Sequence, residues 1–319
     1  MSAVRAFWCD TPNFGDALNV ELFRALGGLE IEPASEDTAE VAGIGSVLDR
    51  FLCDADMPWQ KRRPIRVFSS GFGFGPGGYR RHRPTVLDPE RMRRRVKCFA
   101  VRGLKTADRL RSFFPGIDVG TVGDGGLLAK FIPCGPVDVK YGVGIVPHYA
   151  DRADPVFERL AHDVPGAVVL DPREGVIPFL RHLRECRTVI STAMHPLIAC
   201  DALGIPNRWI RISEDTTSRF KFEDYYSIYG AVPEPLDPRV CAPAELSEEA
   251  IRTHYAIPSG KVAETQERLM ASFNRLCRDL RRPQGRPVFL PSLVRLAASV
   301  VPDRDRRRTL RRKWTYEYC

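Results

Sequence analysis

The sequence of 319 residues lacks the patterns that mark several large classes of protein. It has no run of about 18 apolar residues, so we expect no membrane-spanning helix. Its first residues do not place a charged segment before an apolar one, so we expect no signal peptide and a cytoplasmic protein. With 44% hydrophobic and 28% charged residues, the composition is ordinary for a globular protein that buries a core.

Cysteine pairs and metal-ligand spacings are missing as well. The nine cysteines include no C-x-x-C pair and their number is odd, so a disulfide framework is not expected. No cluster of Cys, His, Asp and Glu has the spacing of a metal site, so we expect no obligatory metal ion. We find neither a Walker loop nor the Rossmann dinucleotide fingerprint, which argues against a nicotinamide cofactor.

Positive charge is concentrated at the end of the chain. The net charge is +8, and residues 286–319 alone hold nine Lys and Arg and three Asp and Glu. An apolar stretch at 288–301 precedes the basic stretch at 304–313, and it is too short and interrupted to span a bilayer. This basic amphipathic tail is predicted to contact an anionic membrane surface, with a solvated, disordered tail as the alternative. No recognition motif supports nucleic acid as the partner.

Strand-like and helix-like segments alternate along the chain, which predicts an α/β protein with parallel sheets. A second series starts near Tyr141, after a segment at 131–140 with two prolines and a glycine. We therefore expect two α/β domains at 1–135 and 136–260, a long helix at 261–285 and the tail at 286–319. Within the second domain, the proline-rich residues 231–260 are predicted to be connecting loops.

Ligands of open α/β sheets bind beyond the carboxyl ends of strands, so residues that follow strands are the candidates. Asn13, Gly15 and Asp16 follow the first strand and open a helix, where free N–H groups can hold an anion or a sugar. The same residues also fit a simple helix cap. Four glycines at alternate positions follow the strand at 65–70: Gly71, Gly73, Gly75 and Gly77. They either let the backbone approach a ligand closely or form a flexible surface loop.

Charged and titratable residues follow the later strands. Arg102 ends one strand, where a guanidinium can bind a carboxylate or phosphate or lie exposed. Asp124 is placed to cap a helix or to face the site. His148 and His195 end two strands of the second domain, and histidine exchanges protons near neutral pH. Lys221 lies on an aromatic-rich helix, where it either binds phosphate or is solvated.

Taken in order, these motifs resemble the polysaccharide pyruvyl transferases, in particular the branch that adds ketal pyruvate to exopolysaccharides. The resemblance runs from about residue 10 to about residue 230. It is carried by NFGDALN at 13–19, VRG at 101–103, GD at 123–124, a strand-end histidine, TAMHPLIACDALGIP at 192–206 and K-F-x-D-Y from Lys221.

The resemblance implies two Rossmann-like domains in a GT-B-like arrangement around a central cleft. It implies transfer of pyruvate from phosphoenolpyruvate to two hydroxyls of one sugar, with release of phosphate and no cofactor. Arg102 and His195 match family positions that handle donor and proton. Protonation of C3 gives C2 cationic character that a sugar hydroxyl traps, and His195 is the candidate acid. Asp16 and Asp124 are candidate bases for the hydroxyl. Substrate-binding residues are predicted to be Arg102, Lys221, His148, Asn13, Gly15, Gly71 and Gly73.

One position departs from the family pattern. Many members carry arginine two residues before the histidine, and this chain has Ala193 there. Lys221, Arg208 and Arg211 are the candidates to replace that charge. Two other functions stay open: a GT-B glycosyltransferase that uses a nucleotide sugar, and a non-catalytic carbohydrate-binding relative. A lipid-linked acceptor would place the enzyme at the inner face of the membrane.

Overall fold

The computed structural model of the chain describes residues 3–9, 11–36, 38–52, 64–75, 95–212, 218–230 and 232–282. Met1–Leu280 form one compact unit. The predicted basic tail and Gly77 lie outside the described residues. None of the described helices is both long enough and apolar enough to cross a membrane.

The first sheet contains, among the described residues, six parallel strands in the order β2-β1-β3-β4-β5-β6. Its strands are β1 Val4–Phe7, β2 Ile31–Pro33, β3 Val41–Ala42, β4 Ile65–Ser70, β5 Val96–Val101 and β6 Thr121–Val122. The chain adds β2 on one side of β1 and then β3 on the other. The order of strands therefore switches between β1 and β3, which is where open α/β sheets bind ligands.

The second sheet has the order β10-β9-β7-β8 within the described part of the chain, and its strands are also parallel. Its strands are β7 Tyr141–Val146, β8 Ala167–Val169, β9 Cys186–Ser191 and β10 Asn207–Trp209. Since β7 pairs with both β8 and β9, the strand order switches between β7 and β9.

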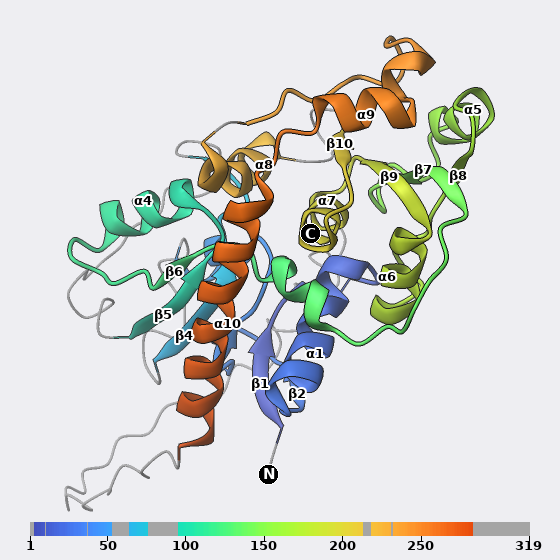
Figure 1. The fold of residues 1–319 in the computed structure, drawn as a ribbon. Coiled ribbons are helices and arrows are strands. Elements are labelled where there is room, and N and C mark those ends of the chain that lie inside the picture. The colour runs from blue at the N-terminus through green and yellow to red at the C-terminus, as the bar shows by residue number, and fades with distance from the viewer. Residues whose placement is uncertain are drawn as a thin grey trace, which may run out of the picture. The chain divides into compact units, whose positions relative to one another are not determined.

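Helices cover both faces of each sheet (Figure 1). Their bounds are α1 Phe14–Gly27, α2 Leu48–Leu52, α4 Leu104–Phe113, α5 Val156–Asp163, α6 Val176–Arg184, α7 Met194–Leu203, α8 Arg219–Tyr226, α9 Glu248–His254 and α10 Ser259–Arg281. The 3-10 helices of the described residues are η2 Gly125–Phe131, η3 Ser227–Tyr229 and η4 Pro243–Leu246.

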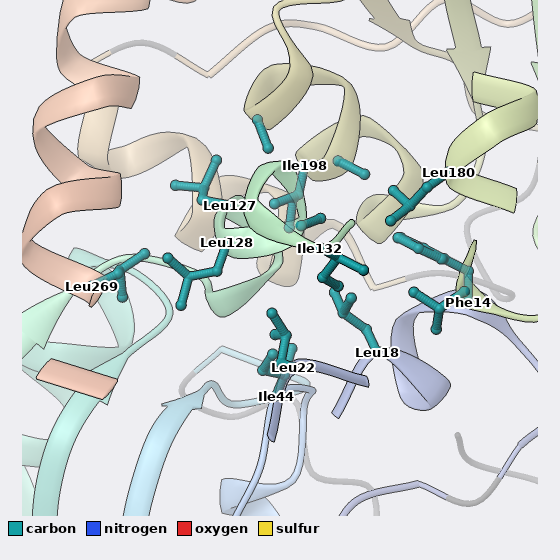
Figure 2. Close-up of a cluster of buried hydrophobic side chains, with 14 of the residues drawn as sticks. Phe14, Leu18, Leu22, Ile44, Leu127, Leu128, Ile132, Leu180, Ile198 and Leu269 are labelled. Atoms are coloured by element: carbon teal, nitrogen blue, oxygen red, sulfur yellow. The ribbon is translucent and has the colours of Figure 1, made fainter. Parts of the chain in front are cut away.

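One continuous hydrophobic core joins elements of both sheets. It holds Leu22 of α1 and Phe68 of β4 together with Val189 of β9 and Leu197 of α7. Figure 2 shows its centre, where side chains from α1, η2, α6, α7 and α10 meet around Ile132. Burial of an aliphatic or aromatic side chain contributes about 1.5–3 kcal/mol, so this cluster stabilises both sheets as one unit.

The long helix α10 packs against the first sheet, although it follows the second in the chain (Figure 1). Phe273 of α10 lies with its ring centroid 5.1 Å from that of Phe68, and Ser272 donates a hydrogen bond to the Phe99 carbonyl. At its end, Asp279 pairs with Arg66 of β4 at 2.6 Å. These contacts of α10 thus attach the last helix of the compact unit to the first sheet.

The mixed α/β structure with parallel sheets is confirmed, and the GT-B-like arrangement of two domains around a cleft stays a prediction. The expectation that residues 231–260 are only connecting loops is wrong, because α9 lies within them. Ser247 caps this helix by accepting a hydrogen bond from the Ala250 N–H, and Glu248 and Glu249 occupy its first turn. These are ordinary signals of a helix start that the nearby prolines obscured.

Candidate functional site

The predicted residues that follow β1, β7 and β9 lie at the two switch points of the sheets. Asn13, Gly15 and Asp16 come after β1, and His148 comes two residues after β7. His195 comes after β9, in the first turn of α7. Both sheets therefore direct their candidate residues to the place where the topology predicts a ligand.

Gly15 and His195 bring the two switch points into direct contact. A Cβ atom added to Gly15 would lie 2.0 Å from His195 Nδ1 and 2.5 Å from its Cγ. Only glycine permits this approach, because real Cβ atoms essentially never come within 3.0 Å of a non-bonded heavy atom. The glycine of the N-F-G-D motif therefore makes room for the histidine ring.

The imidazole of His195 is uncharged at neutral pH. Burial, together with the positive charges of Lys221 and Arg102, lowers its pKa from 6.5 to about 3. Its Nε2 atom is buried and has no hydrogen-bond partner among the described residues. A buried polar atom without a partner is costly unless a ligand supplies one, so Nε2 is the natural contact for a substrate.

His148 lies in the same electrostatic neighbourhood. Burial, Lys221 and His195 lower its pKa to about 3, so it too is neutral. Its backbone N–H donates to Thr192 Oγ1 at 2.7 Å, and its Nδ1 accepts from the Ala150 N–H at 3.3 Å. These contacts fix the ring and leave its Nε2 as the atom available to a ligand.

The positive charge of Lys221 lowers the pKa of both histidines. Burial and the charge of Arg102 lower its pKa from 10.5 to about 8, and Asp16 and Asp151 oppose that change. Among the described residues, none accepts a hydrogen bond from its ammonium or pairs with it. A partly buried ammonium without a partner is poised to bind an anion.

The N-terminus of α7 adds backbone donors beside His195. Its cap residue, Ala193, offers no side-chain hydrogen bond to the first turn. Ser191 Oγ instead accepts from the Ala193 N–H at 2.9 Å and donates to the Val146 carbonyl at 2.8 Å. Free N–H groups at a helix start favour negative charge, and Lys221 strengthens that preference.

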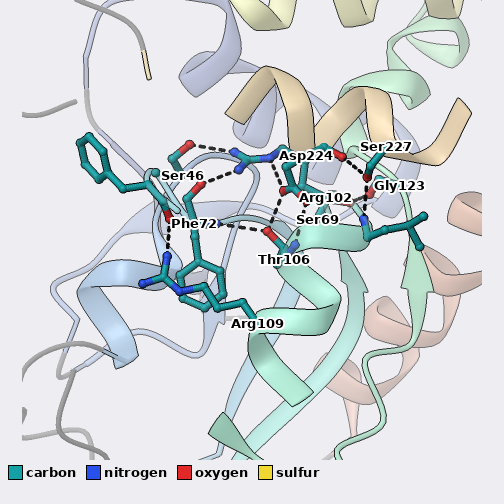
Figure 3. A network of polar contacts seen from close by, with 12 residues as sticks. Ser46, Ser69, Phe72, Arg102, Thr106, Arg109, Gly123, Asp224 and Ser227 are labelled. Atoms are coloured by element: carbon teal, nitrogen blue, oxygen red, sulfur yellow. Dashed lines mark hydrogen bonds and ion pairs between the residues drawn. The ribbon is translucent and has the colours of Figure 1, made fainter. Parts of the chain in front are cut away.

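Arg102 is at the centre of a buried network of hydrogen bonds, shown in Figure 3. Its Nε donates to Asp224 Oδ2 at 2.8 Å, its Nη1 to Ser46 Oγ at 2.8 Å and its Nη2 to the Phe72 carbonyl. Thr106 donates to Asp224 through both its N–H and its hydroxyl. The exposed position considered for Arg102 is wrong, because none of its surface reaches solvent. Its role in donor binding stays a prediction, and the geometry gives it a second role in holding α8 and therefore Lys221.

The glycines after β4 make room for this network. A Cβ on Gly71 would lie 2.3 Å from the Arg102 Cζ atom, and the Gly73 N–H donates to Asp49. Arg109 also holds the loop, since it donates to the Phe74 carbonyl and its guanidinium lies 4.3 Å from the Phe72 ring centre. The loop is thus fastened by protein side chains, and the predicted contact of Gly71 and Gly73 with substrate stays untested.

Asn13 caps α1, as one of the two interpretations predicted. Its Oδ1 accepts from the Asp16 N–H at 3.2 Å, while its Nδ2 donates to Thr11 Oγ1 and to Asp16. Thr11 also donates to the Asp16 carboxylate. Asp16 is buried and influences the pKa of Lys221, so it belongs to the same site.

Asp124 is fully buried at the start of η2. Its Oδ1 accepts from the Gly126 N–H at 2.7 Å, and its Oδ2 has no partner in the described part of the chain. Burial raises its pKa to about 6, while the Gly126 N–H and Arg102 act in the opposite direction. The structure therefore confirms the helix-cap interpretation of its position and leaves its role in catalysis a prediction.

Two features of the site were not predicted from the sequence. The pairing of Arg102 with Asp224 joins residues 122 positions apart, and Thr106 completes it. Ser69 has a φ of 58° at the end of β4, and its hydroxyl donates to the Gly123 carbonyl at 3.0 Å. No local sequence pattern predicts either feature. A serine with a positive φ has no sequence signature, and a pair of distant residues forms only when the chain folds.

Comparison with known proteins places the chain in a family. The profile of the family named polysaccharide pyruvyl transferase matches residues 38–214, which include Arg102, Asp124, His148 and His195. The uncharacterized protein L143 of Acanthamoeba polyphaga mimivirus is 29% identical over 143 residues, or 42% of this chain and 48% of the viral protein. The succinoglycan biosynthesis protein ExoV of Rhizobium meliloti is 26% identical over 238 residues, which are 73% of this chain and 66% of ExoV.

A crystal structure of a functionally uncharacterized protein from Klebsiella pneumoniae aligns with 76% of this chain and 94% of its own. Its TM-score is 0.43 and its sequence identity is 13%. The family profile covers more than half of the chain and includes both strand-end histidines of the site. The chain therefore belongs to the polysaccharide pyruvyl transferase family.

Proposed function

We propose that this protein transfers pyruvate from phosphoenolpyruvate to two hydroxyls of one sugar in a polysaccharide repeat unit. The product is a pyruvate ketal, and phosphate is released. One observation carries the proposal: the charge of an unpaired lysine on α8 lowers the pKa of two neutral histidines that follow β7 and β9, in a chain of this family.

Lys221 takes the place of the arginine that many relatives carry where this chain has Ala193. Phosphoenolpyruvate bears a carboxylate and a phosphate, so its site needs a cation and several N–H donors. Lys221 supplies the cation, and the backbone N–H groups of Met194 and His195 at the start of α7 are the proposed donors. Of the three candidates for the missing charge, Lys221 alone has a charge that lowers the pKa of both His148 and His195.

In this proposal, binding of the anionic donor leads to protonation of His195. In the free protein, burial keeps the imidazole neutral, with a pKa of about 3. An anionic donor beside the ring favours its protonated form and raises that pKa. The imidazolium then becomes the acid that protonates C3 of the donor, a contribution of about 10²–10⁴-fold in rate.

The bonds and protons of the reaction balance without a cofactor. C3 gains a proton from His195, and the first hydroxyl bonds to C2 as it loses its own proton. The C2–oxygen bond to phosphate then breaks, and the second hydroxyl bonds to C2 and loses its proton. One of the two hydroxyl protons returns to His195, and the other leaves with phosphate. Asp16, close enough to affect the pKa of Lys221, is the proposed base for the first hydroxyl.

The acceptor is proposed to be a lipid-linked saccharide, with the tail at 286–319 on an anionic membrane surface. Each basic residue near such a surface contributes about 1 kcal/mol. Sedimentation with vesicles of anionic and of neutral lipid tests this part alone. Full-length protein should sediment with the anionic vesicles, and a chain ending at Arg282 should not. Equal sedimentation of the two chains would remove the tail from the proposal.

Product analysis tests the reaction. The protein is incubated with phosphoenolpyruvate and a panel of hexosides and oligosaccharides, and phosphate and the ketal methyl group are followed by NMR. We expect both products to appear together with one class of acceptor, and neither with His195→Gln. Matched reactions contain UDP or GDP sugars in place of phosphoenolpyruvate. Sugar transfer from a nucleotide, without phosphate release from phosphoenolpyruvate, would establish a glycosyltransferase instead.

A further inference from the structure

A pocket lies at the edge strand β10, and neither His148 nor His195 lines it. It has a volume of about 120 Å³. The residues that matter for its chemistry are Arg208, Trp209, Tyr226, Tyr229, His254 and Tyr255. An apolar cavity of about 150 Å³ holds a benzene molecule, so this smaller, partly open pocket encloses part of a six-membered ring and leaves the rest at its mouth.

Arg208 gives the pocket an unsatisfied positive charge. Its Nε atom is buried without a hydrogen-bond partner, and no described residue forms an ion pair with its guanidinium. The indole Nε1 of Trp209, a fully buried residue, also lacks a partner within the described residues. Buried donors without partners are rare and costly, which points to a ligand that carries acceptor oxygens.

Aromatic side chains form the walls of the pocket and are held rigidly. Tyr255 donates to Asp201 Oδ1 at 2.8 Å, and Tyr229 lies 3.1 Å from the hydroxyl of Tyr225, which donates to Asp201 Oδ2. Trp209 stacks on Phe222 with ring centroids 4.2 Å apart. The buried Asp201 thus fixes two walls in place before any ligand arrives.

We propose that this pocket binds one acidic pyranose ring, with its carboxylate on Arg208 and an apolar C–H face against the tyrosines. A guanidinium matches a carboxylate in bidentate fashion, and a lone cation suits a single charge better than a phosphate. The carboxylate belongs either to a uronic acid of the acceptor or to the pyruvate ketal of the product. The identification of the ring as a saccharide rests on the proposed function.

The pocket is distinct from the candidate active site. Lys221 and Tyr226 both lie on α8, but helical geometry separates them by about 140° around its axis. Lys221 acts on His148 and His195, whereas Tyr226 lines the pocket at β10. The acidic ring therefore positions a longer saccharide without occupying the donor site.

The indole N–H resonance of Trp209, assigned with Trp209→Phe, reports on binding in the full-length protein. The probes are methyl glucuronide, the pyruvate ketal of methyl glucoside, and methyl glucoside as the neutral match. We expect at least one acidic probe to shift the resonance and to bind about tenfold more tightly than the neutral one. Which acidic probe binds identifies the source of the carboxylate.

Variants of Arg208 decide the proposal. Arg208→Gln should weaken binding of the acidic probe about tenfold, and Arg208→Lys should weaken it less. Arg187→Gln changes an exposed arginine of the neighbouring strand β9 and should leave binding unaltered. Thermal unfolding of each variant shows that it is folded. Equal affinity of acidic and neutral probes, no shift of the Trp209 resonance, or unchanged binding in folded Arg208→Gln would overturn the proposal. The same titration with Lys221→Met should be unchanged, so loss of the donor site and loss of this pocket are told apart.

Discussion

Both imidazoles of the candidate active site are neutral at pH 7, and this makes the protein sensitive to acid. Burial lowers the pKa of His148 and of His195 from 6.5 to about 3. In the unfolded chain each histidine takes up a proton near pH 6.5, whereas in the folded protein it does not. Folding stability is therefore intact above pH 6.5 and falls as the pH drops towards 3.

His195→Gln isolates this contribution. The variant has no imidazole to protonate at this position, so its stability relative to the native protein should rise on acidification. The change should approach 1.4 kcal/mol per pH unit between pH 6 and pH 4. Urea unfolding at the two pH values measures it. A difference between the proteins that is the same at both pH values would contradict the lowered pKa.

Lys221 should make donor binding depend on pH in the alkaline range. Its pKa is lowered to about 8, and an anionic donor favours the charged form. Phosphoenolpyruvate affinity should therefore be greatest below pH 8 and fall by up to about tenfold per unit above it. Calorimetric titration should show weaker binding by Lys221→Met below pH 8, without that decline. The same alkaline decline in Lys221→Met would assign it to another group.

At the scale of elements, α1 and α7 touch at Gly15 and His195. Gly15→Ala would place a Cβ atom 2.0 Å from His195 Nδ1, so the ring must move. A displacement of about 1 Å costs about 10²-fold in rate, and we expect a loss of that order in turnover. Gly260→Ala in α10 is the matched control, because nothing lies within 4 Å of its Cβ position. Turnover at the native rate in Gly15→Ala would show that the ring position is not critical.

The attachment of α8 depends on the buried pair of Arg102 and Asp224. Asp224→Asn removes the negative charge and leaves the guanidinium buried without compensation, which costs about 3–5 kcal/mol. Glu223→Gln, one residue away, breaks a partly exposed pair with Lys105 and should cost less than about 1 kcal/mol. Urea unfolding compares the two variants. Similar losses in both would mean that the buried pair does not hold α8.

Most elements were predictable because their local signals are strong. Val96–Val101, Cys186–Ser191 and the helix that ends at Gly204 follow from apolar runs and a glycine cap. The β2 strand and α9 were not predicted, because the first has only three residues and the second follows a proline-rich stretch. His195 was identified by its position after a strand, whereas its contact with Gly15 required the fold.

At the scale of the whole molecule, the shared core predicts a single unfolding transition. One cluster holds core residues from both sheets together with the buried face of α10. A chain that ends at Arg282 should therefore unfold in one cooperative step at the same urea midpoint as the full chain. Circular dichroism and tryptophan fluorescence should give coincident curves. Two separate transitions would contradict one continuous core.

The sequence located the charged tail, but it did not show how charges are distributed around the site. The sequence alone located the excess of basic residues in 286–319. It did not distinguish Lys221 from Arg208 and Arg211 as the replacement for a missing arginine. The fold separates the first two, since Lys221 acts on both histidines and Arg208 lines the pocket at β10.

The identity of the donor is tested most directly by the thermal stability of the protein with phosphoenolpyruvate, UDP sugars and GDP sugars. A ligand at about 100 times its dissociation constant adds about 2.7 kcal/mol of stability. We predict that phosphoenolpyruvate alone stabilises the native protein, that His195→Gln keeps most of this effect, and that Lys221→Met loses it. Stabilisation by a nucleotide sugar alone, or an undiminished effect of phosphoenolpyruvate on Lys221→Met, would contradict the proposed donor site.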